Sequence, residues 1–422
     1  MKAKRKKMQY KLTIPSKLKK EIVLPASKSI SNRALVINAL ASTRIMPSNV
    51  SDCDDTEVMA RALTEKPEIV DIMAAGTAMR FLTAYYSVTE GDRIITGTER
   101  MKHRPIKILV DALRFLGADI VYVGEEGFPP LRIRGKQLVG GNISLAGNIS
   151  SQYISALLMV GPVLASGLTL HLTGTIISRP YIDMTLQLMR DFGAKALWED
   201  EKTIAVEPVP YLERSYTVEN DWSGASYWYE LVALSPDEDA MIVLPGLFMD
   251  SYQGDSSVWG FFEELGVATV FQQNKVILRK KELNLEPVHW NLSSQPDLAQ
   301  TLVVTCALLG KPFHFTGLQT LKIKETDRIK ALRRELLRLG FVISEANDSE
   351  LYWNGPMVSG DEIPVIRTYE DHRMAMAFAP AVYRFPEIRI ADPHVVSKSY
   401  PHFWKALRDV GFTINEEDIC TY

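Results

Sequence analysis

Apolar residues recur at helical spacing along this chain, and several of the apolar stretches end in glycine. In residues 109–116 they follow the period of an amphipathic helix, and Gly117 comes next, ahead of a short strand-like run. Glycine after the last apolar turn predicts a helix end, because glycine adopts a positive φ at little cost. The same helix end recurs at Gly193, Gly266, Gly340 and Gly411, so the five glycines are 76, 73, 74 and 71 residues apart.

A second set of helices is apolar on most of its surface. These helices are predicted to begin near Lys28, Thr77, Ser151, Gly224, Asp297 and His372, at intervals of 49, 74, 73, 73 and 75 residues. The chain therefore reads as six repeats of one plan. Helices that are apolar all round are buried, whereas the glycine-ended helices keep a polar stripe. Each repeat is predicted to be a βαβαββ-type unit with one inner helix and one outer, half-exposed helix.

The first repeat is short by 74 minus 49, or 25, residues, which are missing between Asp55 and Gly76. Three repeats before about residue 221 and three after it predict two similar α/β domains, each an inside-out barrel of three units. The predicted ranges are 25–220 for one domain and 1–24 plus 221–422 for the other, with a hinge near residues 22–26 and 219–224. A hairpin over Tyr10 to Val23 is predicted to complete the second domain.

Charged and small polar residues gather at the predicted helix starts. Cations are unusual there, because a helix N-terminus already carries roughly half a positive charge. The cations that break this preference are Lys28, Arg33, Arg80, Arg104, Lys324, Arg328, Arg373 and Lys398. Their repetition at equivalent places predicts that the helix starts bind anions. The chain has neither of the common glycine-rich nucleotide loops, which favours small metabolites over nucleotides.

Two acidic residues lie among these cations. Asp297 stands at the start of an inner helix, where an acid is most often a cap. Glu325 lies between Lys324 and Arg328. A carboxylate among anion-binding cations weakens anion binding unless it moves a proton, so Glu325 is a candidate acid-base group.

The overall composition excludes several classes of protein. With 48 basic and 51 acidic residues, the net charge of −3 provides no global field for nucleic acid or an anionic membrane. The nine Lys or Arg among the first twenty residues predict a solvated tail. The most apolar stretch, Ile154 to Leu172, is interrupted by glycine, proline and serine, so no membrane span is predicted. Three distant cysteines and seven scattered histidines predict a cytoplasmic protein without disulfides or a metal site.

Four longer motifs resemble those of the 5-enolpyruvylshikimate-3-phosphate (EPSP) synthase family. They occur in the family's order, at Leu24 to Arg33, Ala75 to Arg80, Lys324 to Arg328 and Asp371 to Ala375. The resemblance runs from about Tyr10 to the end of the chain and implies two domains of three repeated units. It implies transfer of the enolpyruvyl group of phosphoenolpyruvate to the 5-hydroxyl of shikimate-3-phosphate, with release of phosphate, on the route to chorismate and the aromatic amino acids. The enzyme implied is a monomer without a cofactor, and glyphosate is the family's inhibitor.

The resemblance also implies roles for single residues. Shikimate-3-phosphate is expected to contact Lys28, Ser29, Arg33, Ser150, Ser151, Ser178, Tyr181, Asp297 and Lys324. Phosphoenolpyruvate is expected to contact Lys28, Gly76, Arg104, Gln152, Arg328, Arg373 and Lys398. Asp297 takes the proton of the 5-hydroxyl in this scheme, while Glu325 protonates the methylene carbon and later removes a proton from it, by way of a tetrahedral intermediate. Lys28 is expected to contact both substrates and is a candidate general acid toward the leaving phosphate; the division of proton transfers between Lys28 and Asp297 stays open.

The chain departs from the family pattern in places. Met73-Ala74 replaces the usual Gly-Asn, Phe81 replaces a frequent proline, and Trp222 begins the segment at the predicted hinge. The first two changes bear on the wall around phosphoenolpyruvate and on the response to glyphosate.

Two alternatives are weighed against this function. An enolpyruvyl transferase acting on UDP-N-acetylglucosamine shares the fold, but usually carries a reactive cysteine five residues before the equivalent of Arg104, where this chain has Glu99. An inert phosphometabolite-binding protein of the same fold is the other, and the intact Asp297 and Glu325 argue against it.

Overall fold

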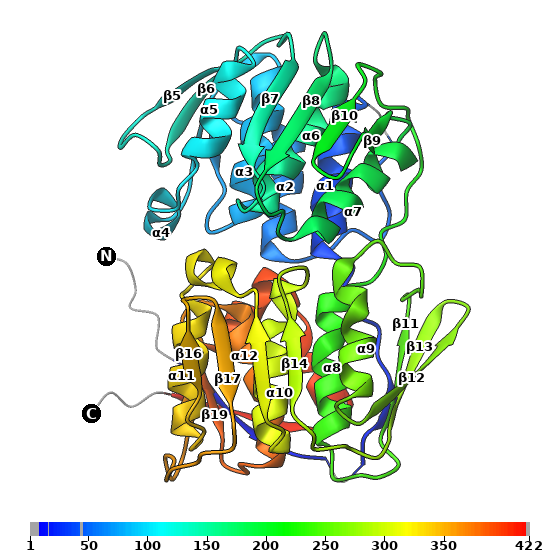
Figure 1. Ribbon diagram of the computed structural model, residues 1–422, viewed down its shortest axis with the longest axis vertical. Helices are drawn as coiled ribbons and strands as arrows, with labels where there is room; N and C mark the ends of the chain where they lie inside the picture. Colours follow the sequence, from blue (N-terminus) through cyan, green and yellow to red (C-terminus); the bar gives the residue numbers. More distant parts are fainter. Residues whose placement is uncertain (1–7, 16, 43–44, 419–422) are drawn as a thin grey trace. The chain divides into compact units, whose positions relative to one another are not determined.

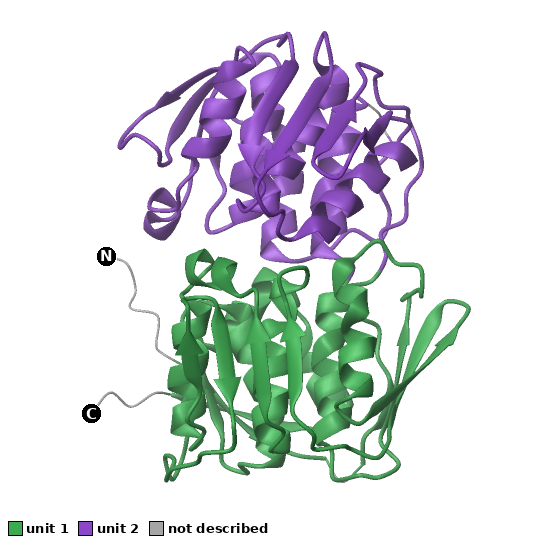
Figure 2. Ribbon diagram, in the orientation of Figure 1, with its two compact units in different colours: residues 1–25, 220–422 green, residues 26–219 purple. Residues whose placement is uncertain are grey.

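The chain forms two compact units in the computed structural model, which describes residues 8–15, 17–42 and 45–418. Unit 1 comprises residues 1–25 and 220–422, and unit 2 comprises residues 26–219 (Figure 2). The ranges predicted from the sequence differ from these by one residue at each boundary. Residues 1–7, with much of the predicted basic tail, and Cys420 lie outside the described residues.

Unit 2 contains two four-stranded sheets and seven α-helices among its described residues (Figure 1). The first sheet has the order β3 (Ile69–Asp71), β4 (Gly91–Thr96), β6 (Leu131–Gly135) and β5 (Asp119–Tyr122). The second has the order β7 (Gly141–Ala146), β8 (Leu168–Thr173), β10 (Thr203–Val206) and β9 (Ala196–Trp198). The helices are α1 (Lys28–Leu40), α2 (Asp54–Glu65), α3 (Gly76–Val88), α4 (Glu99–Lys102), α5 (Lys107–Phe115), α6 (Ser151–Val160) and α7 (Arg179–Asp191).

Unit 1 contains three four-stranded sheets and six α-helices among its described residues. One sheet has the order β12 (Val267–Gln272), β13 (Lys275–Lys280), β11 (Met241–Pro245) and β2 (Lys19–Glu21). The next has the order β14 (Val288–Asn291), β15 (Phe313–Thr316), β17 (Glu350–Trp353) and β16 (Ser344–Ala346). The third has the order β18 (Val365–Ile366), β19 (Arg389–Ala391), β1 (Met8–Thr13) and β20 (Thr413–Asp418). The helices are α8 (Trp222–Leu234), α9 (Val258–Glu263), α10 (Ala299–Leu309), α11 (Arg328–Arg338), α12 (His372–Phe378) and α13 (Phe403–Asp409).

All five sheets share one strand pattern, in which a parallel pair is followed by two antiparallel neighbours. The first repeat has no such sheet among its described residues and keeps only α1, α2 and an isolated bridge between Ser48 and Thr217. The fold class predicted from the sequence, a repeated α/β architecture with a shortened first repeat, is therefore confirmed.

The hairpin predicted over Tyr10 to Val23 is wrong in its pairing. Strand β1 pairs with β19 and β20, whereas β2 pairs in parallel with β11 in a different sheet. The two N-terminal strands thus complete two separate repeats of unit 1. Local polarity could predict two strands, but not that each finds its partners in a distant part of the chain.

The inner helices of each unit pack against one another, α1, α3 and α6 in unit 2 and α8, α10 and α12 in unit 1. Helix α10 is apolar nearly all round, and ten of its eleven residues are buried. Each unit has its own apolar core. The outer helix α5 ends at the predicted glycine, Gly117, whose φ is +100°, and the other four predicted glycines also have positive φ. This confirms the predicted helix ends.

Trp222, a departure from the family pattern, lies in the core of unit 1 with no measurable exposure. Its backbone N–H donates to the side chain of Gln253, 3.1 Å away. The residue therefore anchors the start of α8 by packing.

Glu230 of α8 is an unexpected charged residue in that core. Its side chain is fully buried, and neither carboxyl oxygen has a hydrogen-bond partner among the described residues. Burial raises the pKa of Glu230 well above the ordinary value. The protonated form is therefore favoured in the folded protein.

The folded protein is expected to lose stability as the pH rises, because Glu230 resists ionisation there, and Glu230→Gln is expected to abolish this loss. The pKa of Glu230 is higher in the folded state than in the unfolded state. The contribution of Glu230 to the free energy of unfolding is therefore greatest below about pH 4.5 and falls as the pH rises toward the folded-state pKa, because the unfolded chain ionises first. Thermal melts between pH 5 and 9 should show the variant gaining on the wild type as the pH rises. A constant difference in Tm over this range would contradict the account.

Candidate active site

The start of α1 places Lys28 in contact with the acidic start of α2. Ser27 caps α1 by accepting the backbone N–H of Ile30 at 3.4 Å. The Nζ atom of Lys28 lies 3.4 Å from an oxygen of Asp55, and both side chains are largely buried. A cation at this helix start is thus partly neutralised by a neighbouring carboxylate, which keeps it in place.

Arg33 is buried and bonds to neutral groups only. Its Nε donates to Thr185 at 2.7 Å, and its Nη2 donates to Ser155 at 3.0 Å. The guanidinium also lies over the ring of Phe81, with 5.3 Å to the centroid. Burial lowers the pKa of Arg33 to about 10. Phe81, at a position where the family often has proline, therefore gives this cation an apolar support.

Gly76 begins α3 and lies against Arg104. A Cβ at position 76 would stand 2.5 Å from Nη1 of Arg104. Arg80 fixes both segments, because its guanidinium donates to the carbonyls of Gly76 at 3.0 Å and of Pro105 at 3.2 Å. Nε of Arg104 is buried without a partner among the described residues. The helix start and the arginine together present N–H groups suited to an anion.

Gly76→Ala is expected to impair binding of phosphoenolpyruvate without unfolding the protein. The new methyl would displace the flexible end of Arg104 by about 1 Å, and a shift of that size costs about 10²-fold in kcat/KM when it moves a binding group. The loss should fall mainly on KM for phosphoenolpyruvate, with Tm unchanged. Gly260→Ala is the matched control, because a Cβ at that helical glycine meets nothing within 4 Å. Equal kinetics in the two variants would contradict the placement of Arg104.

The starts of α6 and α7 supply hydroxyl and amide groups. Ser150 caps α6 by accepting the N–H of Gln152 at 3.4 Å, and Gln152 donates to Thr77 at 3.0 Å. Ser178 has φ +54° at the start of α7 and makes no capping bond. A left-handed conformation costs a non-glycine residue about 1 kcal/mol or more and is most frequent at ligand-binding sites. Ser151 and Tyr181 follow in the first turns of the same two helices.

In unit 1, Arg328 holds both candidate acid-base residues. It is the first residue of α11, and its side chain is 2% exposed. Its Nη1 lies 3.1 Å from Asp297, and its Nη2 lies 2.8 Å from Glu325. Lys324 lies 3.5 Å from the same oxygen of Asp297. The two carboxylates predicted to move protons thus share one guanidinium.

Asp371 fixes the orientation of two arginines. It is fully buried, accepts from Nε of Arg328 at 2.7 Å, and accepts from the backbone N–H of Arg373 at 2.9 Å. Arg373 in turn lies 2.9 Å from Asp297. Burial alone would lower the pKa of Arg328, but the charges of Asp371, Glu325 and Asp297 raise it above its ordinary value.

The predicted anion-binding cations of unit 1 therefore have protein partners. Lys324, Arg328 and Arg373 stand against Asp297, Glu325 and Asp371, so this group is close to neutral. Lys398 ends a short 3-10 helix and donates to the carbonyl of Glu370 at 2.7 Å. An incoming anion has to compete with these carboxylates.

Two buried acidic residues of unit 1, Asp371 and Asp255, were not among the predicted site residues. Asp371 begins the fourth motif, Asp371 to Ala375, but the resemblance assigns it no substrate contact. Asp255 stands at the start of an outer helix, at a place in its repeat equivalent to that of Glu325. This equivalence could have predicted Asp255 as a further candidate.

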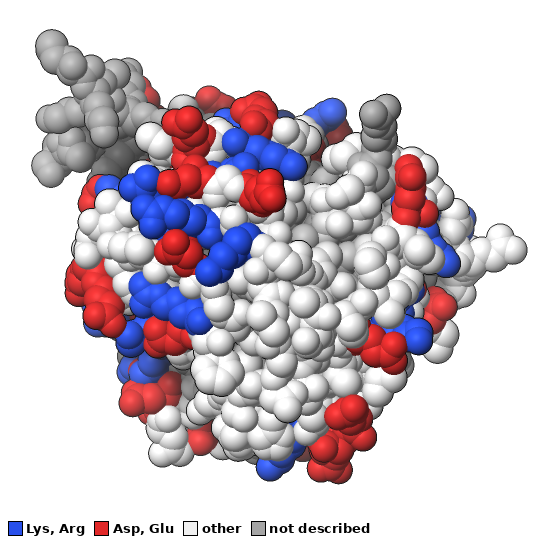
Figure 3. Space-filling view, turned by 90° about the horizontal axis from the view of Figure 1, so that it is seen from above, with Lys and Arg blue, Asp and Glu red and all other residues white. Residues whose placement is uncertain are grey.

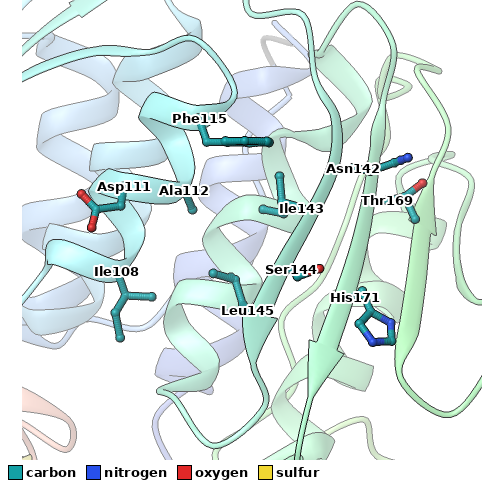
Figure 4. A pocket seen from close by; sticks show the side chains of 10 residues that line it. All are labelled: Ile108, Asp111, Ala112, Phe115, Asn142, Ile143, Ser144, Leu145, Thr169 and His171. Carbon is teal, nitrogen blue, oxygen red and sulfur yellow. The ribbon is translucent and has the colours of Figure 1, made fainter.

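Other kinds of site find little support in the described residues. These residues contain no group of His, Cys, Asp and Glu that could hold a metal ion. A pocket of about 720 Å³ lies between α5 and strands β7 and β8, and no predicted site residue lines it (Figure 4). Its walls mix apolar side chains such as Phe115 with polar ones such as His171.

The fold is that of solved enolpyruvyl transferases. A structure of EPSP synthase from Acinetobacter baumannii matches with a TM-score of 0.79 and 21% identity, covering 97% of this chain and all of that one. The enolpyruvyl transferase NikO from Streptomyces tendae matches with a TM-score of 0.73 and 16% identity, covering 98% of this chain and 100% of that one. Two units of repeated βαβαββ type thus give this chain the fold of the solved enolpyruvyl transferases.

The chain belongs to the EPSP synthase (3-phosphoshikimate 1-carboxyvinyltransferase) family, whose model matches residues 12–66 and 63–407. A 3-phosphoshikimate 1-carboxyvinyltransferase from Bacteroides fragilis is 60% identical over 96% of this chain and 99% of its own length. Another from Vibrio cholerae is 34% identical over 91% of this chain and 95% of its own. The enzyme class predicted from the motifs is confirmed, and both alternatives are disfavoured.

Proposed function

We propose that the chain transfers the enolpyruvyl group of phosphoenolpyruvate to the 5-hydroxyl of shikimate-3-phosphate, with Asp297 and Glu325 as its acid-base residues. The observation that carries this assignment is the sharing of Arg328 by the two carboxylates. Such a pair can serve opposite proton transfers on one reacting centre. The adjacent cations suit two substrates that are both anionic.

The first half of the reaction adds the sugar hydroxyl to phosphoenolpyruvate. Asp297 accepts the hydroxyl proton while the sugar oxygen forms a bond to C2. The electron pair of the double bond takes a proton from Glu325 at C3, which turns the methylene into a methyl group. C2 then carries the sugar oxygen, phosphate, carboxylate and methyl groups as a tetrahedral intermediate.

The second half eliminates phosphate. Glu325, now ionised, removes a proton from the methyl group, the double bond re-forms, and the bond from C2 to the phosphate oxygen breaks. The phosphate leaves with that electron pair and takes up a proton. Lys28 and Asp297 are the two candidates for supplying this proton.

Substrate binding prepares Glu325 for its role. Without substrate its carboxylate is stabilised by Arg328 at 2.8 Å. An anionic substrate that binds Arg328 draws the guanidinium away, which favours the protonated form of Glu325. Binding and activation of the acid are thereby coupled.

The remaining residues are proposed to bind the substrates as the family motifs imply. In unit 2 the helix starts at Lys28, Ser150 and Ser178 bring hydroxyls and a cation to shikimate-3-phosphate. Gly76 and Arg104 present N–H groups to phosphoenolpyruvate. In unit 1, Arg328, Arg373 and Lys398 complete the phosphoenolpyruvate contacts.

We further propose a cytoplasmic monomer whose partners are its two small substrates. Both described cysteines are buried and free of disulfides. No helix among the described residues has the length and apolar character needed to cross a membrane. On the face shown in Figure 3, basic and acidic side chains lie side by side, so this face presents no continuous basic patch for nucleic acid.

Phosphate release tests the proposed function. Purified protein should release phosphate only when shikimate-3-phosphate and phosphoenolpyruvate are both present, and mass spectrometry should find one enolpyruvyl ether per phosphate. Release with UDP-N-acetylglucosamine in place of the shikimate substrate, or with phosphoenolpyruvate alone, would overturn the assignment.

A further inference from the structure

Asp255 is a buried carboxyl group on a segment that contacts α8, as does the segment of the proposed catalytic base, Asp297. It belongs to a short 3-10 helix, Gly254–Ser257, and its exposed fraction is 3%. One carboxyl oxygen accepts a hydrogen bond from Ser223, in the first turn of α8. The other is buried without a hydrogen-bond partner among the described residues.

The usual structural explanation, a helix cap, does not account for Asp255. The 3-10 helix that contains it has no side-chain capping bond, and neither has α9, which follows. A buried carboxylate without its own cation is costly, because the charge leaves water without full compensation.

The segment around Asp255 is fixed in place. The amide of Gln253 accepts the N–H of Trp222 at 3.1 Å and donates to the carbonyl of Asn220 at 2.8 Å. Gln253 is itself buried. Two hydrogen bonds of Gln253 and the bond between Ser223 and Asp255 therefore hold this segment against the start of α8.

Helix α8 connects Asp255 to Asp297. Ser223, which donates to Asp255, lies one turn before Tyr227, whose hydroxyl is 3.5 Å from Arg373, and Arg373 lies 2.9 Å from Asp297.

The charged groups that act on Asp255 come from three other elements. They are Asp297, Arg373 of α12, and Asp221 at the cap of α8. Burial, and after it the charge of Asp297, raise the pKa of Asp255 to about 7, although Arg373 and the bond from Ser223 oppose this shift. Asp297 itself is surrounded by Lys324, Arg328 and Arg373.

Three cations around Asp297 stabilise its ionised form and make it a poor base. A second negative charge nearby offsets them. We propose that Asp255 is a positioning residue that acts through its charge to increase the basicity of Asp297 toward the sugar hydroxyl. This inference rests on the proposed role of Asp297 as the base.

The pH dependence of turnover tests this role. In the wild type, kcat should rise through an inflection near pH 7 as Asp255 ionises and Asp297 becomes a stronger base. Asp255→Asn should remove the inflection and lower kcat above pH 8 by about 3- to 10-fold, as expected for a base weakened by about one pKa unit. KM should change little, because Asp255 contacts no substrate in the proposal.

Two further variants guard against a purely structural effect. Glu230→Gln, at another buried carboxyl of unit 1, should keep the inflection. Ser223→Ala removes the bond that favours the ionised form of Asp255, so the inflection should move to higher pH. An inflection unchanged in Asp255→Asn or, should that variant not fold, in Ser223→Ala would overturn the proposal.

A titration that does not depend on turnover can test the coupling of Asp255 to Asp297 separately from the proposed reaction. Carbon-13 spectra of aspartate-labelled protein should show one carboxyl titrating near pH 7, absent in Asp255→Asn. Its midpoint should fall in Asp297→Asn, since the neighbouring negative charge is gone. A midpoint that is the same in Asp297→Asn would sink the coupling, even in an enzyme that releases phosphate as expected.

Discussion

Replacing Glu325 with Gln is expected to lower turnover about 10²-fold or more while both substrates still bind. The amide keeps the size of the side chain and can still accept from Arg328, but it cannot donate a proton to C3 or remove one later. Loss of a positioned acid-base group costs typically 10² to 10⁴ in rate. Stopped-flow or steady-state phosphate release gives the rate, and calorimetry gives the two affinities.

Glu345→Gln is the matched control for this variant. Glu345 is exposed to a similar degree, 20% against 22%, and likewise accepts from an arginine of α11, Arg333. Turnover should be unchanged in the control. A Glu325→Gln enzyme with more than a tenth of wild-type turnover would remove Glu325 from the proton-transfer scheme.

Replacing Arg328 with Met is expected to destabilise unit 1 by about 3–5 kcal/mol, the usual cost of breaking a buried ion pair by removing one partner. The reason is Asp371, which is fully buried and takes its shortest charged contact, 2.7 Å, from Arg328. Asp297 and Glu325 also lose a donor. Urea unfolding measures the effect, and affinity for phosphoenolpyruvate should fall in the folded fraction.

Arg333→Met separates this effect from the general loss of a cation on α11. Arg333 pairs with Glu345 at the surface and is 42% exposed, so its removal should cost only about 0–1 kcal/mol. Comparable losses of stability in the two variants would show that the buried network is not the source.

The repeat pattern could be predicted from the sequence because it depends on local features. Glycine at 117 and at the four equivalent positions marks helix ends through backbone conformation alone, and the apolar surface of α10 reports its burial directly. The pairing of β1 and β2 with different sheets could not be predicted, because it depends on which distant sheet lacks a strand.

The candidate site, too, could be predicted only in part from the sequence. The motifs contain Lys28, Glu325 and Arg328, the resemblance adds Asp297, and the structure brings Asp297, Glu325 and Arg328 together. The sequence predicted that the cations at helix starts bind substrate anions, whereas in the structure those of unit 1 form ion pairs with carboxylates of the protein. These ion pairs depend on the directions of the side chains, which cannot be read from the order of the residues. The stacking of Arg33 on Phe81 was hidden for the same reason.

The central claim, that Glu325 protonates C3 and then deprotonates the resulting methyl group, is tested most directly by the reaction in D₂O. Protonation at C3 in D₂O gives a CH₂D group, and whenever this group loses a proton, and not the deuteron, solvent deuterium stays in the methylene of the product. The account predicts deuterium in the enolpyruvyl methylene made by the wild type, and a rate of deuterium incorporation that falls in Glu325→Gln together with turnover. Product without deuterium from the wild type, or normal labelling by Glu325→Gln, would contradict it.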